Sequence, residues 1–247
     1  MTQPQHLTIL TGASRGMGLG LAQQLLAAGH RLLCLSRNAN PALASALCEQ
    51  WTVDLADPAP VAARLAEWLA AQGTPASATL INNAGLIPAI APVGDIAAAD
   101  LARAMRVDLE APMLLTGAFL RATAGWAVPR KVLNISSGLG RRAMASQAAY
   151  CAAKAGMDHF TRSVALEEAL APHGAKVCSL APGVIDTDMQ VQLRGADSAS
   201  FPDIANFIGM KEKGQLSSPQ DAAQRVLAYL NRPDFGANPV ADVRDPA

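Results

Sequence analysis

Three side chains stand at spacings that suit proton transfer to a carbonyl oxygen, namely Ser137, Tyr150 and Lys154. Tyr150 and Lys154 are four residues apart, so they share one face of a helix. A free phenol has a pKa of about 10, and a neighbouring ammonium group lowers it. Acid–base catalysis is most efficient when the pKa of the group lies near the working pH. We therefore expect Lys154 to tune Tyr150 as a proton donor, with Ser137 hydrogen-bonded to the same oxygen.

A glycine-rich turn follows the first apolar segment, in the run Thr11-Gly12-Ala13-Ser14-Arg15-Gly16-Met17-Gly18. Glycines between a strand and a helix let the backbone approach a pyrophosphate, and the helix N-terminus favours its negative charge. The spacing is G-x-x-x-G-x-G rather than G-x-G-x-x-G. On the turn alone, a structure made only for packing stays open as an alternative to a nucleotide site.

The residues after the second apolar segment predict which dinucleotide binds. Dinucleotide folds place an acidic residue there for the ribose 2′-hydroxyl of NAD, whereas an arginine suits the 2′-phosphate of NADP. This chain has Ser36-Arg37-Asn38. With Arg15 beside the glycine turn, two guanidinium groups can hold one phosphate. We predict NADP(H) as the cofactor, and two solvated surface arginines are the alternative.

Short apolar segments alternate with Ala- and Leu-rich segments of helical period, which is typical of β-α-β units and a parallel sheet. We expect a single α/β domain over residues 1–247, with a doubly wound, Rossmann-like sheet of about seven strands and helices on both faces. The predicted strand order begins 3-2-1-4-5-6. Strands are predicted at 7–11, 31–36, 51–53, 78–82, 131–136, 176–180 and 239–243, and helices at 16–28, 42–49, 58–72, 100–123, 147–170, 206–214 and 218–230.

Ligands of such sheets bind beyond the carboxyl ends of the strands. Every motif singled out here follows a predicted strand or begins the helix after it. We therefore expect the sheet to gather the glycine turn, Arg37, the run Asn82-Asn83-Ala84-Gly85, Ser137 and the run beginning at Pro182 along one edge.

Charge and hydropathy limit the partners. Basic and acidic residues number 20 each, so the formal net charge is zero, and no broad basic field attracts nucleic acid or anionic lipid. The start of the chain lacks the basic region of a signal peptide, and no apolar stretch approaches the ~20 residues of a membrane span. Neither the cysteines nor the histidines have metal-ligand spacing. We expect a cytoplasmic protein with a small-molecule partner, no nucleic acid, no membrane and no metal.

Taken together, the motifs resemble the short-chain dehydrogenase/reductase family over nearly the whole chain. The resemblance rests on the glycine turn, Asn82 to Gly85, Ser137, the Tyr150/Lys154 pair and the run Pro182-Gly183-Val184-Ile185-Asp186-Thr187. Leu139-Gly140-Arg141-Arg142 and the continuation to Gln190 are similar to the sepiapterin reductase and benzil reductase branch. The resemblance implies NADPH-dependent reduction of a ketone or 1,2-diketone, with Tyr150 protonating the carbonyl oxygen.

The resemblance also implies roles along the cofactor. Lys154 would bind the nicotinamide ribose, Asp54 would meet the adenine, and Ile185 and Thr187 would hold the carboxamide. It further implies a homodimer or homotetramer. The remaining residues of the expected cofactor site are Gly12, Ser14, Gly16, Met17, Gly18, Leu55, Asn83, Ala84, Gly85, Tyr150, Pro182 and Gly183.

One position departs from the family pattern, because the chain has Asp108 where the family usually places an asparagine. That asparagine supports a local helix distortion and a water linked to the catalytic lysine. Asp108 can accept a hydrogen bond, but when ionised it lacks the amide donor and adds a charge near Lys154. We include Asp108 in the catalytic set and predict that activity survives. The alternative is a sensor that binds NADP(H) without turnover.

Apolar residues amid glycines predict a mobile substrate lid at about residues 188–217. With Leu139 and Met144 opposite, and Gly183, Val184 and Met189 at the lid side, the pocket favours an uncharged, apolar or aromatic carbonyl compound. Simple packing of these residues onto the core is the alternative. The adjacent Arg141 and Arg142 are candidates for contact with a substrate carboxylate, and solvated arginines are the alternative there.

Overall fold

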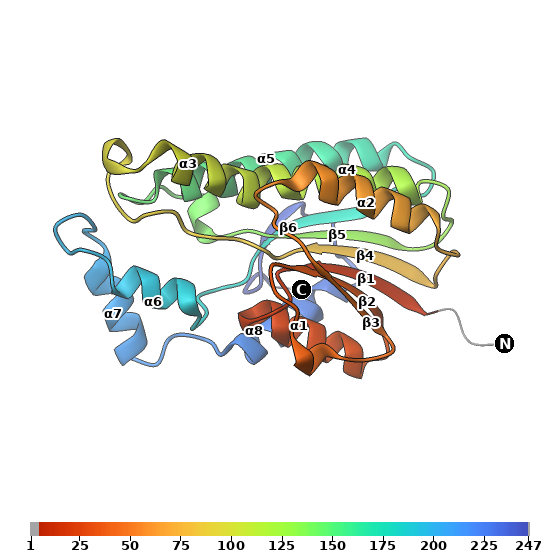
Figure 1. Cartoon of the computed structure of the whole chain (residues 1–247), viewed down its shortest axis with the longest axis horizontal. Coiled ribbons are helices and arrows are strands. Elements are labelled where there is room, and N and C mark those ends of the chain that lie inside the picture. The colour runs from red at the N-terminus through yellow and green to blue at the C-terminus, as the bar shows by residue number, and fades with distance from the viewer. Residues whose placement is uncertain (1–4, 247) are drawn as a thin grey trace.

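The computed structural model describes residues 5–246, so residues 1–4 and 247, the ends of the predicted domain, lie outside the described residues. Within this range seven parallel strands form one sheet in the order β3-β2-β1-β4-β5-β6-β7 (Figure 1). The predicted doubly wound α/β fold is confirmed. The strands are β1 His6–Thr11, β2 Arg31–Ser36, β3 Cys48–Thr52, β4 Ser77–Asn82, β5 Arg130–Ile135, β6 Lys176–Ala181 and β7 Val240–Asp242.

Helices cover both faces of the sheet, which is why its central strands are almost entirely buried and mostly apolar. In Figure 1, α2, α4 and α5 lie over one face and α1 and α8 over the other, while α6 and α7 extend beyond one end of the sheet. The two faces carry separate apolar cores, one including Leu65 and Phe119 and the other including Leu21 and Val226. The helices are α1 Gly16–Ala27, α2 Pro58–Ala70, α3 Ala98–Met105, α4 Ala111–Thr123, α5 Ala148–Ala169, α6 Asp188–Arg194, α7 Ile204–Glu212 and α8 Pro219–Leu230.

The helix predicted at 42–49 is wrong. A single 3₁₀ turn at Pro41–Leu43 takes its place, and the edge strand β3 begins earlier than expected, at Cys48. Two side chains favour this local structure. Asn40 accepts a hydrogen bond from the Ala42 amide, and the Gln50 amide bonds the Asn40 backbone at 2.8 and 3.1 Å.

The helix predicted at 100–123 is interrupted by a π-helical turn, η3, at Arg106–Glu110. Pro112 explains the interruption, because proline lacks an amide hydrogen and its ring crowds the carbonyl four residues back. The Ala111 amide donates instead to Arg106, five residues back. The wider turn carries Asp108, whose side chain is completely buried.

Candidate active site

A cleft of about 980 Å³ runs along the carboxyl ends of the strands. Its wall includes the predicted catalytic residues Ser137, Tyr150 and Lys154, together with the residues predicted to bind the cofactor and the apolar residues predicted to bind the substrate. Asp108, which is buried behind the wall, and Arg141, a candidate for contact with a substrate carboxylate, are absent from it. The structure thus brings the predicted residues together, and their individual roles stay predictions.

The glycine turn forms a cradle of backbone at one end of the cleft. Gly12 and Gly16 have φ angles of +70° and +55°, which side chains rarely tolerate. A Cβ on Gly18 would lie 2.0 Å from the Gly12 carbonyl oxygen, so only glycine fits there. Asn83 ties the turn to β4 through donation from its Nδ2 to the carbonyls of Thr11 and Gly12, at 3.0 and 3.2 Å. This cradle fits the pyrophosphate of a dinucleotide, with the start of α1 facing it.

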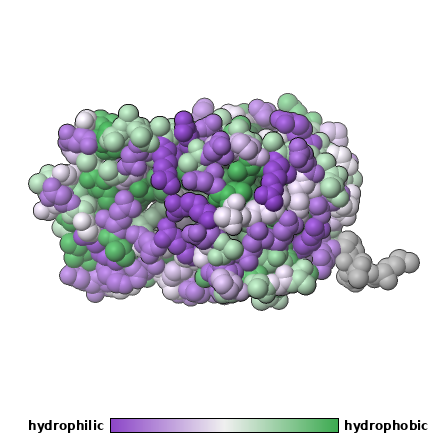
Figure 2. Space-filling model, in the orientation of Figure 1, coloured by the Kyte–Doolittle hydropathy of each residue, from purple (hydrophilic) through white to green (hydrophobic). Residues whose placement is uncertain are grey.

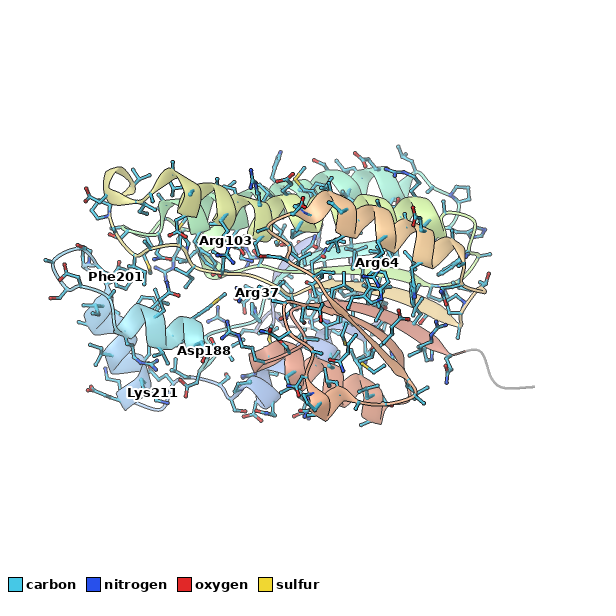
Figure 3. The ribbon with its side chains drawn as sticks, viewed as in Figure 1. Arg37, Arg64, Arg103, Asp188, Phe201 and Lys211 are labelled. Atoms are coloured by element: carbon cyan, nitrogen blue, oxygen red, sulfur yellow. The ribbon has the colours of Figure 1, made fainter. Side chains whose placement is uncertain are left out.

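The end of the cleft that is predicted to hold the adenosine is rich in guanidinium groups. Arg15 and Arg37 line it as expected, and Arg103 of α3 joins them from the opposite side (Figure 3). Arg103 lies 3.9 Å from Asp54, the predicted adenine neighbour. Arg15 Nη1 lies 2.5 Å from the Asp188 carboxylate at the start of α6. The glycine turn is therefore connected to the lid through an exposed ion pair.

Tyr150 lies in the first turn of α5, with Lys154 one turn further along the helix. The Lys154 ammonium donates to the Ile135 carbonyl at 2.9 Å and lies 5.6 Å from the centroid of the Tyr150 ring. Ser137 follows the end of β5, and its hydroxyl accepts a hydrogen bond from the Leu139 amide at 3.1 Å. The three side chains thus meet at one point of the cleft.

The electrostatics of Tyr150 differ from the expectation. Burial raises the pKa of Tyr150, the nearby Asp108 raises it further, and a hydrogen bond with Ser137 lowers it. The prediction that Lys154 brings this pKa down is therefore wrong for the net shift, because desolvation outweighs the favourable interactions. Tyr150 keeps its proton at neutral pH, which suits a proton donor.

The lid region contains α6 and α7. Leu193, Phe201 and Phe207 form a small apolar core of its own, and apolar side chains gather at this end of the molecule in Figure 2. Met189, Phe207 and other lid residues also line the cleft. Phe201 is fully buried in packing, whereas Met189 lines the cleft, and the mobility of the lid stays a prediction.

The comparisons with known proteins agree with this geometry. The family model of the short chain dehydrogenases matches residues 6–198. The chain belongs to this family. It is 34% identical over 236 residues to the Bacillus cereus benzil reductase ((S)-benzoin forming), covering 92% of this chain and 94% of the relative.

Two further relatives extend the comparison. A sepiapterin reductase of Xenopus tropicalis is 31% identical over 248 residues, covering 91% of this chain and 90% of the relative. The crystal structure of a short-chain dehydrogenase/reductase from Burkholderia vietnamiensis superposes with a TM-score of 0.66 at 33% identity, covering 98% of this chain and all of that one. The predicted family and its likeness to the benzil and sepiapterin reductase branch are confirmed. The chain is an oxidoreductase of the class that acts on carbonyl or alcohol groups.

Asp108 is the position where this short-chain dehydrogenase departs from the expected asparagine. Its Oδ1 accepts a hydrogen bond from the Leu86 amide at 2.9 Å. Burial raises the pKa of Asp108 to about 6, while Lys154 and the Leu86 amide act in the opposite direction. The carboxyl group therefore changes charge close to neutral pH, beside the lysine of the active site.

Two residues near the site, Arg103 and Asp158, belong to none of the motifs that predicted the site. The side chains of Arg141 and Arg142 lie in different surroundings. Arg142 lines the cleft, whereas Arg141 Nε lies 3.2 Å from the buried carboxylate of Asp158. Neither expectation for Arg141, substrate contact or full solvation, is correct. Sequence spacing gave one signal, since Asp158 is four residues after Lys154 on the same helix.

Within residues 5–246, no group of three or more His, Cys, Asp or Glu side chains is placed to hold a metal ion. No helix in the same range combines the length and apolar character needed to cross a membrane.

Proposed function

We propose that the protein is an NADPH-dependent carbonyl reductase that transfers hydride to a ketone or 1,2-diketone of a small, apolar or aromatic substrate. The observation that supports this most directly is that one cleft contains both parts of the site. It has a backbone cradle for a dinucleotide at one end and Ser137, Tyr150 and Lys154 at the other. Reduced nicotinamide, when bound, supplies hydride to the carbonyl carbon.

The preference for NADP(H) rests on the adenosine end of the cleft. Arg15 and Arg37 both line it, and neither the turn nor the end of β2 places a carboxylate against a 2′-phosphate. Two guanidinium groups bind a phosphate through charge-assisted hydrogen bonds, which are about twice as strong as neutral ones. A 2′-hydroxyl gives them no such partner.

Different residues of the chain have different roles around the carbonyl oxygen. Ser137 donates a hydrogen bond that orients it, and Tyr150, which holds its proton at neutral pH, donates that proton as the alcohol forms. Lys154 binds the nicotinamide ribose hydroxyls and keeps a positive charge near the phenol. Asp108 is buried behind Lys154 and has a pKa of about 6. In this proposal Asp108 exchanges a proton with the amine of Lys154.

The substrate class follows from the opposite wall of the cleft. Leu139, Met144, Val184 and Met189 give this wall an apolar surface, which suits an aromatic or aliphatic carbonyl compound rather than an anion. The name of the Bacillus cereus relative, a benzil reductase, agrees with an aromatic diketone.

Self-association is a further part of the proposal. Met113 of α4, Leu166 of α5 and Leu170, which directly follows α5, are exposed by 41, 73 and 89%. Exposed apolar side chains on neighbouring helices favour burial against another subunit. We expect a homodimer or homotetramer, which light scattering during gel filtration measures directly.

The decisive experiment follows NADPH absorbance while the purified protein is mixed with diketones, quinones and aldehydes in turn. A reductase consumes NADPH with at least one of these substrates, and consumes NADH more slowly. Binding of NADPH without consumption across the whole panel would instead favour a sensor, the alternative that the buried Asp108 suggests.

A further inference from the structure

A buried carboxylate lies directly beneath the catalytic residues. Asp158 is only 1% exposed and stands one turn after Lys154 on α5. Its Oδ1 accepts hydrogen bonds from two hydroxyls, that of Ser136 after β5 and that of Ser179 in β6, each at 2.6 Å. The carboxylate therefore joins α5 to the two strands that flank the active site.

Arg141 supplies the charge partner of this carboxylate. Its Nε lies 3.2 Å from Asp158 Oδ2, and its Nη2 donates to the Ala241 carbonyl of β7 at 2.9 Å. The guanidinium thus reaches away from the cleft and into the protein. The Arg141 side chain is 31% exposed and that of Asp158 only 2%. Because Asp158 Oδ2 has no hydrogen-bond partner within the described residues, the carboxylate depends on this guanidinium to compensate its charge.

The segment held by this pair is the one that carries Ser137. Ser137 and Arg141 flank the 3₁₀ turn η4, Gly138–Gly140. The turn packs closely on α5, because a Cβ on Gly140 would lie 2.9 Å from Asp158 Oδ2 and 3.0 Å from the Lys154 carbonyl oxygen. Movement of the turn would move Ser137 relative to Tyr150.

We propose that Arg141 and Asp158 are positioning residues for carbonyl reduction, and that their ion pair holds the Ser137 turn in place against α5 and β7. This inference rests on the proposed function. Neither residue lines the cleft. Arg141 and Asp158 act through Ser137, and Asp158 also acts through Lys154.

The charge of Asp158 also affects the pKa of Lys154. Lys154 faces the ionisable groups of Asp108, Tyr150 and Asp158. Burial lowers the pKa of Lys154, and the two carboxylates raise it. Around Asp158 itself the other ionisable groups are Arg141 and the neutral thiol of Cys178. Loss of the Asp158 charge therefore lets the pKa of Lys154 fall, so that the ammonium loses its proton at a lower pH.

The test compares Asp158→Asn and Arg141→Met with Arg162→Met, an exposed arginine on the same helix as the control. We expect both test variants to lower kcat roughly 10- to 100-fold, the scale of a displaced catalytic group, while the KM for NADPH stays unchanged. In Asp158→Asn the alkaline loss of activity also moves to lower pH. A role in folding alone would leave this pH profile in place.

Hydrogen exchange of the amides of residues 138–142 tests the same idea without turnover. We expect faster exchange in Arg141→Met, and in Asp158→Asn where it folds, but not in Arg162→Met. Unchanged exchange, or unchanged kcat and pH profile in an active enzyme, would overturn the inference. If the wild-type protein reduces no carbonyl compound, the proposed function fails, and hydrogen exchange still decides whether the ion pair holds the turn.

Discussion

The floor of the cleft and its lid are held together by different kinds of contact. The floor, meaning Lys154, Asp108 and Asp158, consists of charged side chains that are 4, 0 and 1% exposed. The lid, residues 188–217, is tied to the rest of the protein partly through exposed ion pairs. In the pair between Arg15 and Asp188 the two side chains are 67 and 72% exposed.

This difference in burial has consequences for both energy and motion. Removal of one partner from a buried ion pair leaves an uncompensated charge and costs about 3–5 kcal/mol, whereas an exposed pair contributes about 0–1 kcal/mol and is screened by salt. In the floor this cost applies to Asp158, whose buried carboxylate is paired with Arg141. The lid has a small core around Phe201 and Phe207 that also packs against Ile87, Ile90 and Met144, and its movement to admit the substrate stays a prediction.

Replacement of Tyr150, which lines the cleft one turn before Lys154 on α5, by phenylalanine has the largest expected effect. We expect kcat to fall by roughly 10²- to 10⁴-fold, because the proton donor is lost while the ring stays in place. NADPH binding, measured by fluorescence titration, should stay close to wild type. An active Tyr150→Phe enzyme would show that the proton comes from another group.

Arg37→Asp tests whether the adenosine end recognises a 2′-phosphate. A carboxylate there repels the phosphate and accepts hydrogen bonds from a ribose 2′-hydroxyl. We expect the ratio of kcat/KM for NADPH over NADH to fall about 10- to 100-fold, the scale of one charge-assisted hydrogen bond of about 1.5–3 kcal/mol. Arg121→Asp, on the exposed surface of α4, controls for a general change of charge. An unchanged ratio would contradict the NADP(H) preference.

Asp108→Asn measures how much the buried charge of Asp108 lowers the free energy of unfolding. Because burial raises the pKa of Asp108 from 3.8 to about 6, its stabilising contribution is present below the unfolded pKa and is lost as the pH rises through the folded pKa. Relative to the asparagine variant, wild type should thus lose roughly 1 to 2 kcal/mol of unfolding free energy between pH 5 and pH 8. Urea unfolding at the two pH values measures this difference.

The same variant also tests the proposed proton exchange. Asparagine does not titrate, so the pH dependence of kcat should change near pH 6 in Asp108→Asn, while NADPH affinity stays similar. A stability difference with an unaltered pH profile would give Asp108 a structural role in the floor and no part in proton transfer.

Sequence patterns predicted the sheet well because most strands contain a short apolar run, and the alternation with helices fixes a parallel order. They failed where one or two side chains decide the local structure. Asn40 and Gln50 stabilise a turn in place of the helix predicted at 42–49. Pro112 opens a π-helical turn at Arg106–Glu110, which a helical hydrophobic period does not reveal.

The position of the site was predictable for a similar reason, since motifs that follow parallel strands meet at one edge. The direction of a pKa shift was not, because it depends on desolvation, which the spacing of Tyr150 and Lys154 does not contain. Likewise the chain order does not say that Arg141 binds Asp158 while Arg142 lines the cleft. These are contacts of the folded protein, set by which side chain the turn η4 directs inward.

A substitution in the lid has the smallest expected effect, a change in the affinity for NADPH. Asp188→Asn removes the exposed ion pair that engages Arg15, so Arg15 becomes free to bind the 2′-phosphate. We expect NADPH to bind up to about fivefold more tightly, consistent with an exposed pair of at most about 1 kcal/mol, while NADH affinity stays the same. Isothermal titration with both cofactors at low and high salt measures this, and the gain should shrink at high salt, where the wild-type pair is already screened. Equal gains for NADPH and NADH would mean that Asp188 acts on the lid alone, and that Arg15 does not contribute to the choice of cofactor.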